Sequence, residues 1–453
     1  KGIPAITLSD GPNGVRKQAG AADHLGLNPS VPATCFPTSS ATACSWDEKL
    51  GEAVGEALGE EAAAQEVAVL LGPGLNIQRS PLCGRDFEYF SEDPILAGRM
   101  AAAYVRGIQK NGISACPKHF AVNSQELRRM ASDSVLDERT LRELYLTGFE
   151  IVVKEAKPKT IMTSYNLING TYANENAHLL QDILRKDWGF DGAVVTDWGG
   201  SNDHALGVKN GSTLEMPCPG GDSIRELMKA VQDGKISEAD VDARLDEMLE
   251  LVLSTHAAVE KAPRTFDAAA HHKLARRAAA ESIVLLKNEG GILPLKPNEK
   301  LAVIGDFAET PRYQGAGSSA VNALQVDTLL DSIKADDSGI TLVGYASGFE
   351  RQGAADAEKL EEAVALAKKA DTVLLCLGLD ELRESEGLDR ADMKLAENQQ
   401  QLLAAVAAVN PNVVVLLSAG APVETPWVGQ CRALVYGALG GQAGAGAAAD
   451  ILT

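Results

Sequence analysis

A regular alternation of short apolar runs with long amphipathic stretches most constrains the fold of the first 255 residues. The runs have the length of buried strands, and the stretches between them, such as Trp46–Gln65 and Glu138–Ala156, have helical spacing. Strands that alternate with helices form parallel sheets, and about 250 residues is typical of a (β/α)8 barrel. We therefore expect an α/β fold with a (β/α)8-type barrel over residues 1–255. The clearest runs are Val67–Leu71, Gly112–Cys116, Thr160–Ser164 and Ala193–Thr196.

A second α/β unit is expected over residues 273–453, after a polar, alanine-rich linker at 256–272. Its apolar runs also alternate with helical stretches, which predicts a smaller domain around a mostly parallel sheet. The chain starts and stops inside apparent structural elements, so we expect both ends to be truncated. The runs are Leu301–Asp306, Thr341–Tyr345, Thr372–Leu377, Asn412–Ser418 and Ala433–Tyr436.

Charge and cysteine content limit the partners that this chain is expected to have. The 62 acidic residues outnumber the 42 basic residues and give a net charge of −20, which repels nucleic acid and anionic lipid. No apolar run of about 18 residues is present, so we expect neither nucleic acid nor a membrane as a partner. The seven cysteines form no Cys-x-x-Cys pair, which argues against a disulfide framework and structural zinc and favours a cytoplasmic location.

The glycine-rich segment Gly315–Ser319 resembles a phosphate-binding loop only superficially. It has neither the Lys-Ser/Thr ending nor the Gly-x-Gly-x-x-Gly spacing that such loops use. The adjacent pair His271 and His272 lies at the start of a polar helix without nearby residues that would complete a metal site. We therefore expect no cofactor and no metal, while the oligomeric state, including a homodimer, stays open.

Polar residues with useful chemistry follow the apolar runs of the first domain. Lys118 and His119 follow one run, Tyr165 follows another, and Asp197 and Trp198 follow a third. Barrel enzymes place their active sites at the carboxyl ends of their strands. Asp197 is therefore a candidate catalytic carboxylate, beside an indole surface suited to a sugar ring. The structural alternative is an aspartate that caps the next helix.

Glycoside cleavage generally needs a second carboxyl group, which either protonates the leaving oxygen or activates water. The acidic segment Leu379–Arg390 follows the apolar run Thr372–Leu377 and so lies at another strand end. Glu384 and Glu386 are its candidates for the second carboxyl group. A solvated acidic loop without a catalytic role is the alternative interpretation.

Eight motifs, which occur in this order along nearly the whole chain, resemble those of glycoside hydrolase family 3. Together they are far more specific than any one of them alone. The resemblance implies a barrel followed by an α/β sandwich, in agreement with the pattern of apolar runs. The motifs are Leu8–Arg16, Leu71–Gly74, Arg79–Glu88, Ser91–Pro94, Lys118–Ala121, Thr163–Asn166, Ala193–Gly199 and Glu384–Arg390.

The resemblance also implies roles for individual residues. It identifies Asp197 as the nucleophile and Glu386, in preference to Glu384, as the acid/base. It implies that the nucleophile forms a covalent glycosyl intermediate, and that the two carboxyl groups lie about 5–5.5 Å apart, as retention requires. It further implies a sugar pocket with Ser318 as a contribution from the second domain. The other implied pocket residues are Asp10, Arg16, Arg85, Lys118, His119, Arg129, Tyr165 and Trp198.

The activity that the resemblance implies is that of a retaining exo-β-glycosidase, a β-glucosidase that releases terminal β-D-glucose. The family branch that removes N-acetylglucosamine carries Lys-His-Phe-Pro-Gly-His, whereas residues 118–123 read Lys-His-Phe-Ala-Val-Asn. Alternatives are a β-xylosidase or α-arabinofuranosidase with the same machinery, a phosphorylase, and a sugar-binding relative that has lost catalysis. Sugar and linkage specificity, aglycone preference and the presence of a fibronectin-like domain stay open.

Overall fold

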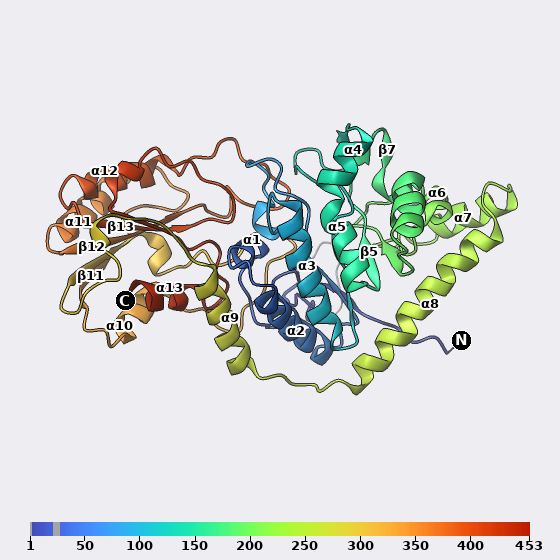
Figure 1. The fold of residues 1–453 in the computed structure, drawn as a ribbon, viewed down its shortest axis with the longest axis horizontal. Coiled ribbons are helices and arrows are strands. Elements are labelled where there is room, and N and C mark those ends of the chain that lie inside the picture. The colour runs from blue at the N-terminus through green and yellow to red at the C-terminus, as the bar shows by residue number, and fades with distance from the viewer. Residues whose placement is uncertain (1, 21–27) are drawn as a thin grey trace. The chain divides into compact units, whose positions relative to one another are not determined.

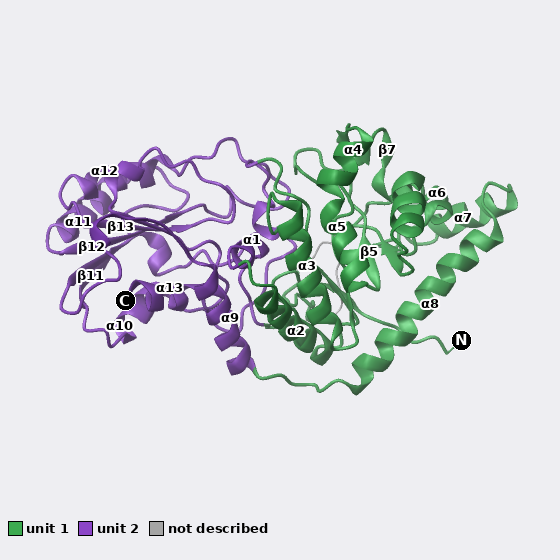
Figure 2. Cartoon of the chain, in the orientation of Figure 1, with its two compact units in different colours: residues 1–33, 46–80, 89–267 green, residues 34–45, 81–88, 268–453 purple. Residues whose placement is uncertain are grey.

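The computed structural model describes residues 2–20 and 28–453, and the chain forms two compact units (Figure 1, Figure 2). Unit 1 comprises residues 1–33, 46–80 and 89–267, and unit 2 comprises residues 34–45, 81–88 and 268–453. Two short segments of the first hundred residues therefore fold with the C-terminal part of the chain. The order of apolar runs along the sequence does not reveal that these two segments belong to unit 2.

Parallel strands of unit 1 bring residues from distant parts of the chain to neighbouring strand ends. The strands are β1 (Leu8–Asp10), β2 (Val69–Leu71), β3 (Ser114–Ala115), β5 (Thr160–Met162) and β8 (Ala193–Val195). Strands β1, β2 and β3 pair in parallel in that order, and β5 pairs in parallel with β8. A parallel bridge between Phe120 and Thr163 links the segments that follow β3 and β5. Strands β2, β3, β5 and β8 are buried throughout, as parallel strands covered on both faces should be.

The residues that directly precede several helices of unit 1 explain where those helices begin. Asp47 and Asp93 each accept hydrogen bonds from two backbone N–H groups at a helix start, and Ser237 with Asp240 forms a capping box. The α-helices are α2 (Glu48–Ala64), α3 (Pro94–Gln109), α4 (Glu138–Thr140), α5 (Thr147–Ile151), α6 (His204–Asn210), α7 (Asp222–Gln232) and α8 (Glu238–Lys261). The remaining elements of unit 1 are β4 (Asp133–Ser134), β6 (Leu167–Ile168), β7 (Thr171–Tyr172), the 3-10 turn η4 (Ala173–Glu175) and the π-helical η2 (Leu141–Tyr145), η3 (Val152–Ala156) and η5 (His178–Asp187).

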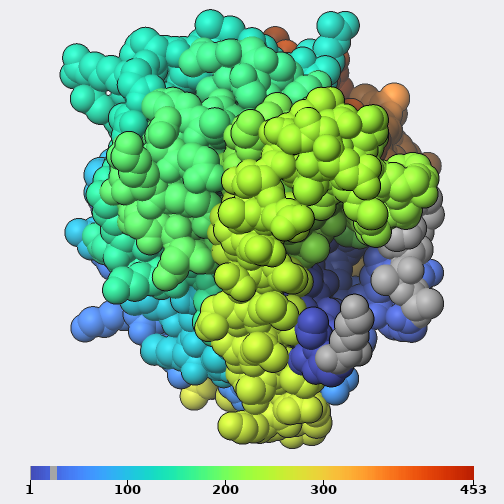
Figure 3. Space-filling model, turned by 90° about the vertical axis from the view of Figure 1, so that its right-hand side faces the viewer, coloured from blue at the N-terminus to red at the C-terminus, as the bar shows by residue number. Residues whose placement is uncertain are grey.

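The segment 256–272, predicted as a linker, is helical at both ends. Helix α8, labelled in Figure 1 and seen as a yellow-green band of surface atoms in Figure 3, continues to Lys261, and α9 (Ala268–Ser282) begins seven residues later. Alanine has the highest helix propensity, and the alanine-rich composition of this segment therefore supports helix even without a clear apolar period.

The sheet of unit 2 has six strands in the order β11-β10-β12-β13-β14-β9. Its strands are β9 (Val284–Asn288), β10 (Lys300–Ile304), β11 (Thr341–Ala346), β12 (Thr372–Gly378), β13 (Val413–Ser418) and β14 (Ala433–Tyr436). All pairs are parallel except β14 with β9, so the five runs predicted as strands form a parallel sheet. The antiparallel edge strand β9 was not predicted; it exposes Leu285 and Leu286 and so lacks the pattern of a buried strand.

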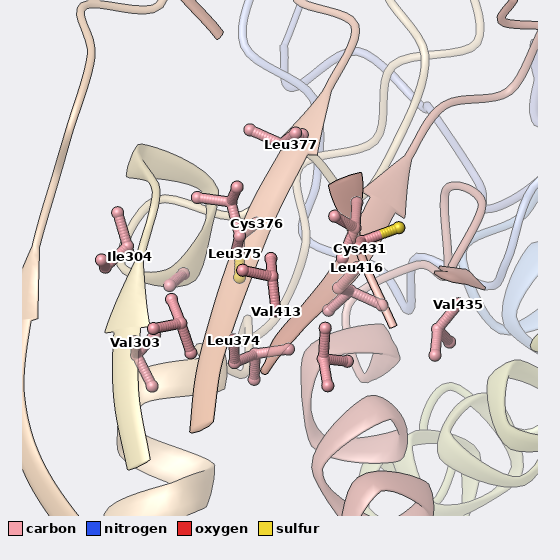
Figure 4. Close-up of a cluster of buried hydrophobic side chains, with 14 of the residues drawn as sticks. Val303, Ile304, Leu374, Leu375, Cys376, Leu377, Val413, Leu416, Cys431 and Val435 are labelled. Carbon is pink, nitrogen blue, oxygen red and sulfur yellow. The ribbon is translucent and has the colours of Figure 1, made fainter. Parts of the chain in front are cut away.

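The core of unit 2 forms around its central strands, where Figure 4 shows Leu374, Leu375 and Val413 among the buried side chains. All seven residues of β12 are buried, so both of its faces are covered. The other elements of unit 2 are α1 (Ser39–Ala43), η1 (Asp86–Glu88), η6 (Glu289–Gly291), η7 (Asp306–Ala308), α10 (Leu329–Ala335), α11 (Ala357–Ala367), α12 (Glu397–Ala407), η8 (Val428–Gln430) and α13 (Gly444–Leu452).

The described part of the chain has neither a membrane-spanning helix nor a candidate metal cluster. Within residues 2–20 and 28–453, no helix has both the length and the apolar character needed to cross a bilayer. The same residues contain no group of three or more His, Cys, Asp and Glu side chains placed to hold a metal ion.

Candidate active site

The carboxyl ends of the parallel strands in unit 1 bring the predicted residues Asp10, Lys118, His119 and Asp197 to one edge of the fold. Asp10 is the last residue of β1, and the Lys118 side chain, which is 2% exposed, places Nζ 3.7 Å from Asp10 Oδ1. The main chain folds back after β1, where Arg16 N donates to Asp10 O at 2.8 Å. This hydrogen bond joins the main chain of Asp10 to that of Arg16 across the turn.

Asp197 follows β8 by two residues and keeps part of its side chain accessible. Its Oδ1 accepts a hydrogen bond of 2.7 Å from the backbone N–H of Trp198, and its Oδ2 lies 3.6 Å from His119 Nε2. The Asp197 side chain is 13% exposed, whereas that of His119 is 1% exposed. A carboxylate in this state is oriented by neighbours and can still be reached by a ligand.

His119 is held by residues that the sequence analysis did not single out. Asn76 bonds both the N–H and the C=O of His119 at 2.8 Å, and Tyr89 Oη lies 3.1 Å from His119 Nδ1. Asn123 donates to Tyr89 Oη at 3.1 Å. When the Tyr89 hydroxyl donates to Nδ1, Nε2 carries the ring proton and faces Asp197 as a donor.

The main chain and the aromatic side chains directly beside Asp197 involve three further predicted residues, Tyr165, Trp198 and Arg129. The Tyr165 hydroxyl donates to Trp198 O at 2.9 Å, and so holds the main chain directly after Asp197. The Arg129 guanidinium lies 4.9 Å from the centre of the Tyr165 ring and pairs with the buried Glu126 at 2.8 Å. The Trp198 side chain is 46% exposed, as an aromatic platform for a ligand would be.

In unit 2, Glu386 lies at the tip of a turn in the loop after β12. An antiparallel bridge between Ser385 and Leu388 closes this turn, with Glu386 and Gly387 between them. Ser318 donates to Glu386 Oε2 from its backbone N at 2.7 Å and from its Oγ at 2.5 Å. Gly317 has a φ of +121°, and a Cβ there would lie 2.4 Å from Glu386 Cβ, so this close contact requires glycine. Ser318, predicted as a contribution from the second domain, thus contacts the candidate acid/base.

Arg85 belongs to unit 2 and lies against Glu386. Its Nε and Nη2 donate to the two oxygens of Glu88 at 2.8 and 2.9 Å, and its Nη1 lies 3.6 Å from Glu386 Oε1. Such a bidentate pair is strong and directional. Arg85 is 1% exposed and Glu88 is fully buried, so this pair fixes the guanidinium that faces Glu386.

Glu384, the other candidate for the acid/base, points into the core of unit 2. Its side chain is fully buried and accepts from Gly420 N at 2.9 Å, with Arg312 Nη2 at 3.8 Å. Burial raises the pKa of Glu384, while the Arg312 charge and the Gly420 N–H act in the opposite direction. The Glu386 side chain is 15% exposed, so the geometry favours Glu386 as the group that meets a substrate.

The segment 81–88, which is buried from Cys83 onward, packs against the loop that carries Glu384 and Glu386. Gly84 N donates to Asp389 Oδ1 at 3.2 Å, and a Cβ on Gly84 would lie 1.7 Å from Leu388 O. Asp86 is fully buried in this segment, and burial followed by the nearby Glu384 charge raises its pKa to about 8. A carboxyl group with this pKa stays protonated in the folded protein at neutral pH.

The Asp86→Asn substitution is expected to change how stability depends on pH. Between pH 3.8 and about 8 the unfolded state loses the Asp86 proton and the folded state keeps it, so the free energy of unfolding falls as pH rises. Each pKa unit corresponds to about 1.4 kcal/mol. The stability of the Asn variant relative to the parent should therefore rise from pH 4 to pH 8 and then level off, as measured by urea unfolding.

A control for this measurement is Asp233→Asn. Lys229 lowers the pKa of the exposed Asp233, so this variant should lose stability relative to the parent at neutral pH and regain it as pH falls. A difference between Asp86→Asn and the parent that stays constant from pH 4 to pH 9 would contradict the expected effect of Asp86.

Several residues that were not predicted support the side chains around Asp197 in unit 1 and around Glu386 in unit 2. Their partners lie far away in sequence in most cases, and therefore only the folded chain reveals them. Two pairs, Arg85 with Glu88 and Glu126 with Arg129, have the i, i+3 spacing of opposite charges that the sequence does display. The residues not predicted are Asn76, Asp86, Glu88, Tyr89, Asn123 and Glu126.

Comparison with known proteins gave matches over nearly the whole chain. The model of the glycosyl hydrolase family 3 N-terminal domain matches residues 21–251, and the model of the C-terminal domain of the same family matches residues 283–453. The chain is 47% identical over 455 residues to thermostable beta-glucosidase B of Acetivibrio thermocellus, covering 100% of this chain and 60% of that protein. It is 45% identical over 464 residues to an exo-alpha-(1->6)-L-arabinopyranosidase of Bifidobacterium longum, covering 100% of this chain and 61% of that protein.

Solved structures are similar to this chain in the same way. A family 3 beta-glucosidase of Bifidobacterium adolescentis superimposes with a TM-score of 0.92 at 43% identity, covering 100% of this chain and 65% of the other. Beta-glucosidase 3B of Thermotoga neapolitana, solved in complex with α-D-glucose, superimposes with a TM-score of 0.90 at 33% identity, covering 100% and 67%. The chain thus spans about three fifths of the curated relatives that it matches.

Proposed function

Because the chain belongs to glycosyl hydrolase family 3 and places two candidate carboxyl groups at strand ends, we propose that it is the catalytic part of a retaining exo-β-glucosidase. The observation that carries this proposal is that each of the two carboxyl groups is partly accessible and lies beside a buried side chain. Asp197 lies beside His119, and Glu386 lies beside Arg85. The substrate is a β-glucoside or β-linked oligosaccharide from which terminal β-D-glucose is released. The 47% identical beta-glucosidase of Acetivibrio thermocellus supports this specificity.

Asp197 is the nucleophile in this proposal, and Glu386 is the acid/base. In the first step a carboxylate oxygen of Asp197 forms a bond with the anomeric carbon, the glycosidic bond breaks, and Glu386 gives its proton to the leaving oxygen. In the second step Glu386 takes a proton from water, the hydroxide forms the new bond to the anomeric carbon, and Asp197 leaves. Retention of configuration follows from these two displacements.

Donors around Asp197 suit a sugar substrate. The N–H of His119 Nε2 and the ammonium of Lys118 can donate to hydroxyl groups, and Asp10 can accept from them. In unit 2, Ser318 and Arg85 orient Glu386. The remaining predicted pocket residues, Arg16, Arg129, Tyr165 and Trp198, act as binding or positioning groups in the same proposal.

The finer architecture is also part of the proposal. The parallel strands of unit 1 support a (β/α)8-like barrel within residues 1–255, and the covered sheet of unit 2 supports an α/β sandwich over residues 273–453. Within the predicted linker 256–272, residues 262–267 are the non-helical connection. The seven cysteines form no Cys-x-x-Cys pair, which supports a cytoplasmic location.

Initial rates on a panel of nitrophenyl glycosides test the proposed specificity. We expect release from the β-D-glucoside to exceed that from β-D-xyloside, α-L-arabinofuranoside and β-N-acetylglucosaminide. An α-L-arabinopyranoside belongs in the panel because of the 45% identical Bifidobacterium relative, and faster release from it would replace the glucosidase proposal. Release only with added phosphate would indicate a phosphorylase, and sugar binding without release would indicate a relative that has lost catalysis.

A further inference from the structure

Glu175 is a buried carboxylate of unit 1 that the proposed chemistry does not use. It ends η4, directly after β7, and is 3% exposed. The neighbouring Asn174, 1% exposed, accepts from Thr163 Oγ1 at 3.1 Å, which ties this turn to the segment that follows β5. The turn that carries Glu175 is therefore hydrogen-bonded to the strand region of unit 1 through its neighbour Asn174.

The Glu175 side chain holds the far end of the loop that carries Asp197. Its Oε1 accepts from the backbone N–H groups of Asn202 at 2.9 Å and of Asp203 at 3.2 Å. Its own C=O accepts from Asn210 Nδ2 at 2.7 Å, at the end of α6. Figure 1 shows β7 and α6 in the same part of unit 1. One residue thus holds both the start and the end of this short helix.

The near end of the same loop is held by other groups. Tyr165 donates to Trp198 O at 2.9 Å, Gly199 N donates to Met216 O at 2.7 Å, and Gly200 N donates to Asp197 O at 2.9 Å. The loop 197–203 is therefore tied at both ends, and the Glu175 side chain forms the tie at the far end.

Burying the Glu175 carboxyl group has an energetic cost. Burial raises the pKa of Glu175, and the nearby Asp203 charge acts in the same direction, while the N–H groups of Asn202 and Asp203 and the Asn174 side chain act in the opposite direction. Burying a carboxylate is unfavourable unless hydrogen bonds compensate it. Two backbone donors to Oε1 give part of the compensation, and they also make the loop position depend on this one side chain.

We infer that Glu175 is a positioning residue for the reaction, because its carboxylate fixes the loop that holds Asp197 and the Trp198 indole in place. The inference rests on the proposed role of Asp197 as the nucleophile. A nucleophile displaced by about 1 Å loses on the order of 10²-fold in rate, since the bond to the anomeric carbon forms only from an aligned approach.

The test compares Glu175→Ala, Glu175→Gln and a matched control by steady-state kinetics on a nitrophenyl β-glucoside. We expect kcat of Glu175→Ala to fall by about 10²-fold. Glu175→Gln keeps an oxygen that can accept from both N–H groups, and should recover about tenfold of that loss. The rate at which a 2-deoxy-2-fluoro glycoside labels Asp197 should fall in parallel with kcat.

Glu247→Gln is the matched control. Glu247 is a carboxylate with a side chain 10% exposed, it pairs with Arg185 and Arg244, and it accepts from Thr213 Oγ1. Thr213 Oγ1 accepts from Val194 N, within the body of β8, so this network supports the strand itself. The control should lower Tm and leave kcat of the folded protein unchanged.

Two outcomes would overturn the inference. One is a folded Glu175→Ala protein with kcat within twofold of the parent, and the other is an equal loss of kcat in Glu175→Ala and Glu247→Gln. Asp197→Asn separates these failures from failure of the proposed function. If that variant is inactive while Glu175→Ala is fully active, only the role of Glu175 is wrong, whereas an active Asp197→Asn enzyme refutes the nucleophile on which the role depends.

Discussion

Replacing Asp197 by Asn is expected to lower kcat for β-glucoside hydrolysis by about 10⁴-fold or more, because the amide cannot form the covalent intermediate. The side chain keeps its size and can still accept from Trp198 N, so the fold and the Tm should change little. Initial rates with a nitrophenyl β-glucoside, together with thermal unfolding, measure both effects.

Asp191→Asn is the control for this experiment. Asp191 is an exposed aspartate that precedes β8, at the opposite end of the strand from Asp197, and its substitution should leave kcat unchanged. Mass spectrometry after incubation with a 2-deoxy-2-fluoro glycoside should find the sugar on Asp197 of the parent enzyme. A fully active Asp197→Asn protein, or a label on another carboxylate, would show that Asp197 is not the nucleophile.

Replacing Glu386 by Ala is expected to lower kcat/KM by about 10²- to 10⁴-fold on substrates with a poor leaving group. The loss should be much smaller for a dinitrophenyl glycoside, since its leaving group departs without a proton. Added azide should accelerate turnover, because azide attacks the glycosyl intermediate without help from a base and yields a β-glycosyl azide. Rates with and without azide on both kinds of substrate test this role.

Glu384→Ala is the matched comparison. Glu384 is fully buried with Arg312 and Gly420 as partners, so its loss should lower Tm. Azide should not restore its activity, because the effect acts through the loop rather than through the missing proton. Azide rescue of Glu384→Ala and not of Glu386→Ala would reverse the assignment of the two residues.

Much of the α/β architecture and several site residues could be predicted from local pattern. The runs that became β5, β8, β12 and β13 were recognisable because parallel strands are apolar on both faces. Asp197 was recognisable as a polar residue that follows such a run, whereas Glu386 was chosen over Glu384 only by the resemblance to glycoside hydrolase family 3. Strand β9 was not, because it lies at a sheet edge with Leu285 and Leu286 exposed.

The supporting residues could not be predicted in the same way. Asn76 holds His119 across 43 positions, and Glu175 holds Asn202 across 27 positions, so no local pattern connects these partners. The i, i+3 pairs Arg85 with Glu88 and Glu126 with Arg129 were visible in the sequence, but many exposed pairs share that spacing. Burial distinguishes these pairs, and burial is a property of the folded chain.

The sequence by itself determined the family, the alternation of strands and helices, and the positions of the two candidate carboxylates, because each of these depends on residues that are close together in the chain. Only the tertiary structure decided which of two glutamates is accessible: Glu384 is fully buried and Glu386 is 15% exposed. It also decided that segment 81–88, with Arg85, folds with unit 2. The physical reason is that desolvation and hydrogen bonding act between neighbours in space, whatever their separation along the chain.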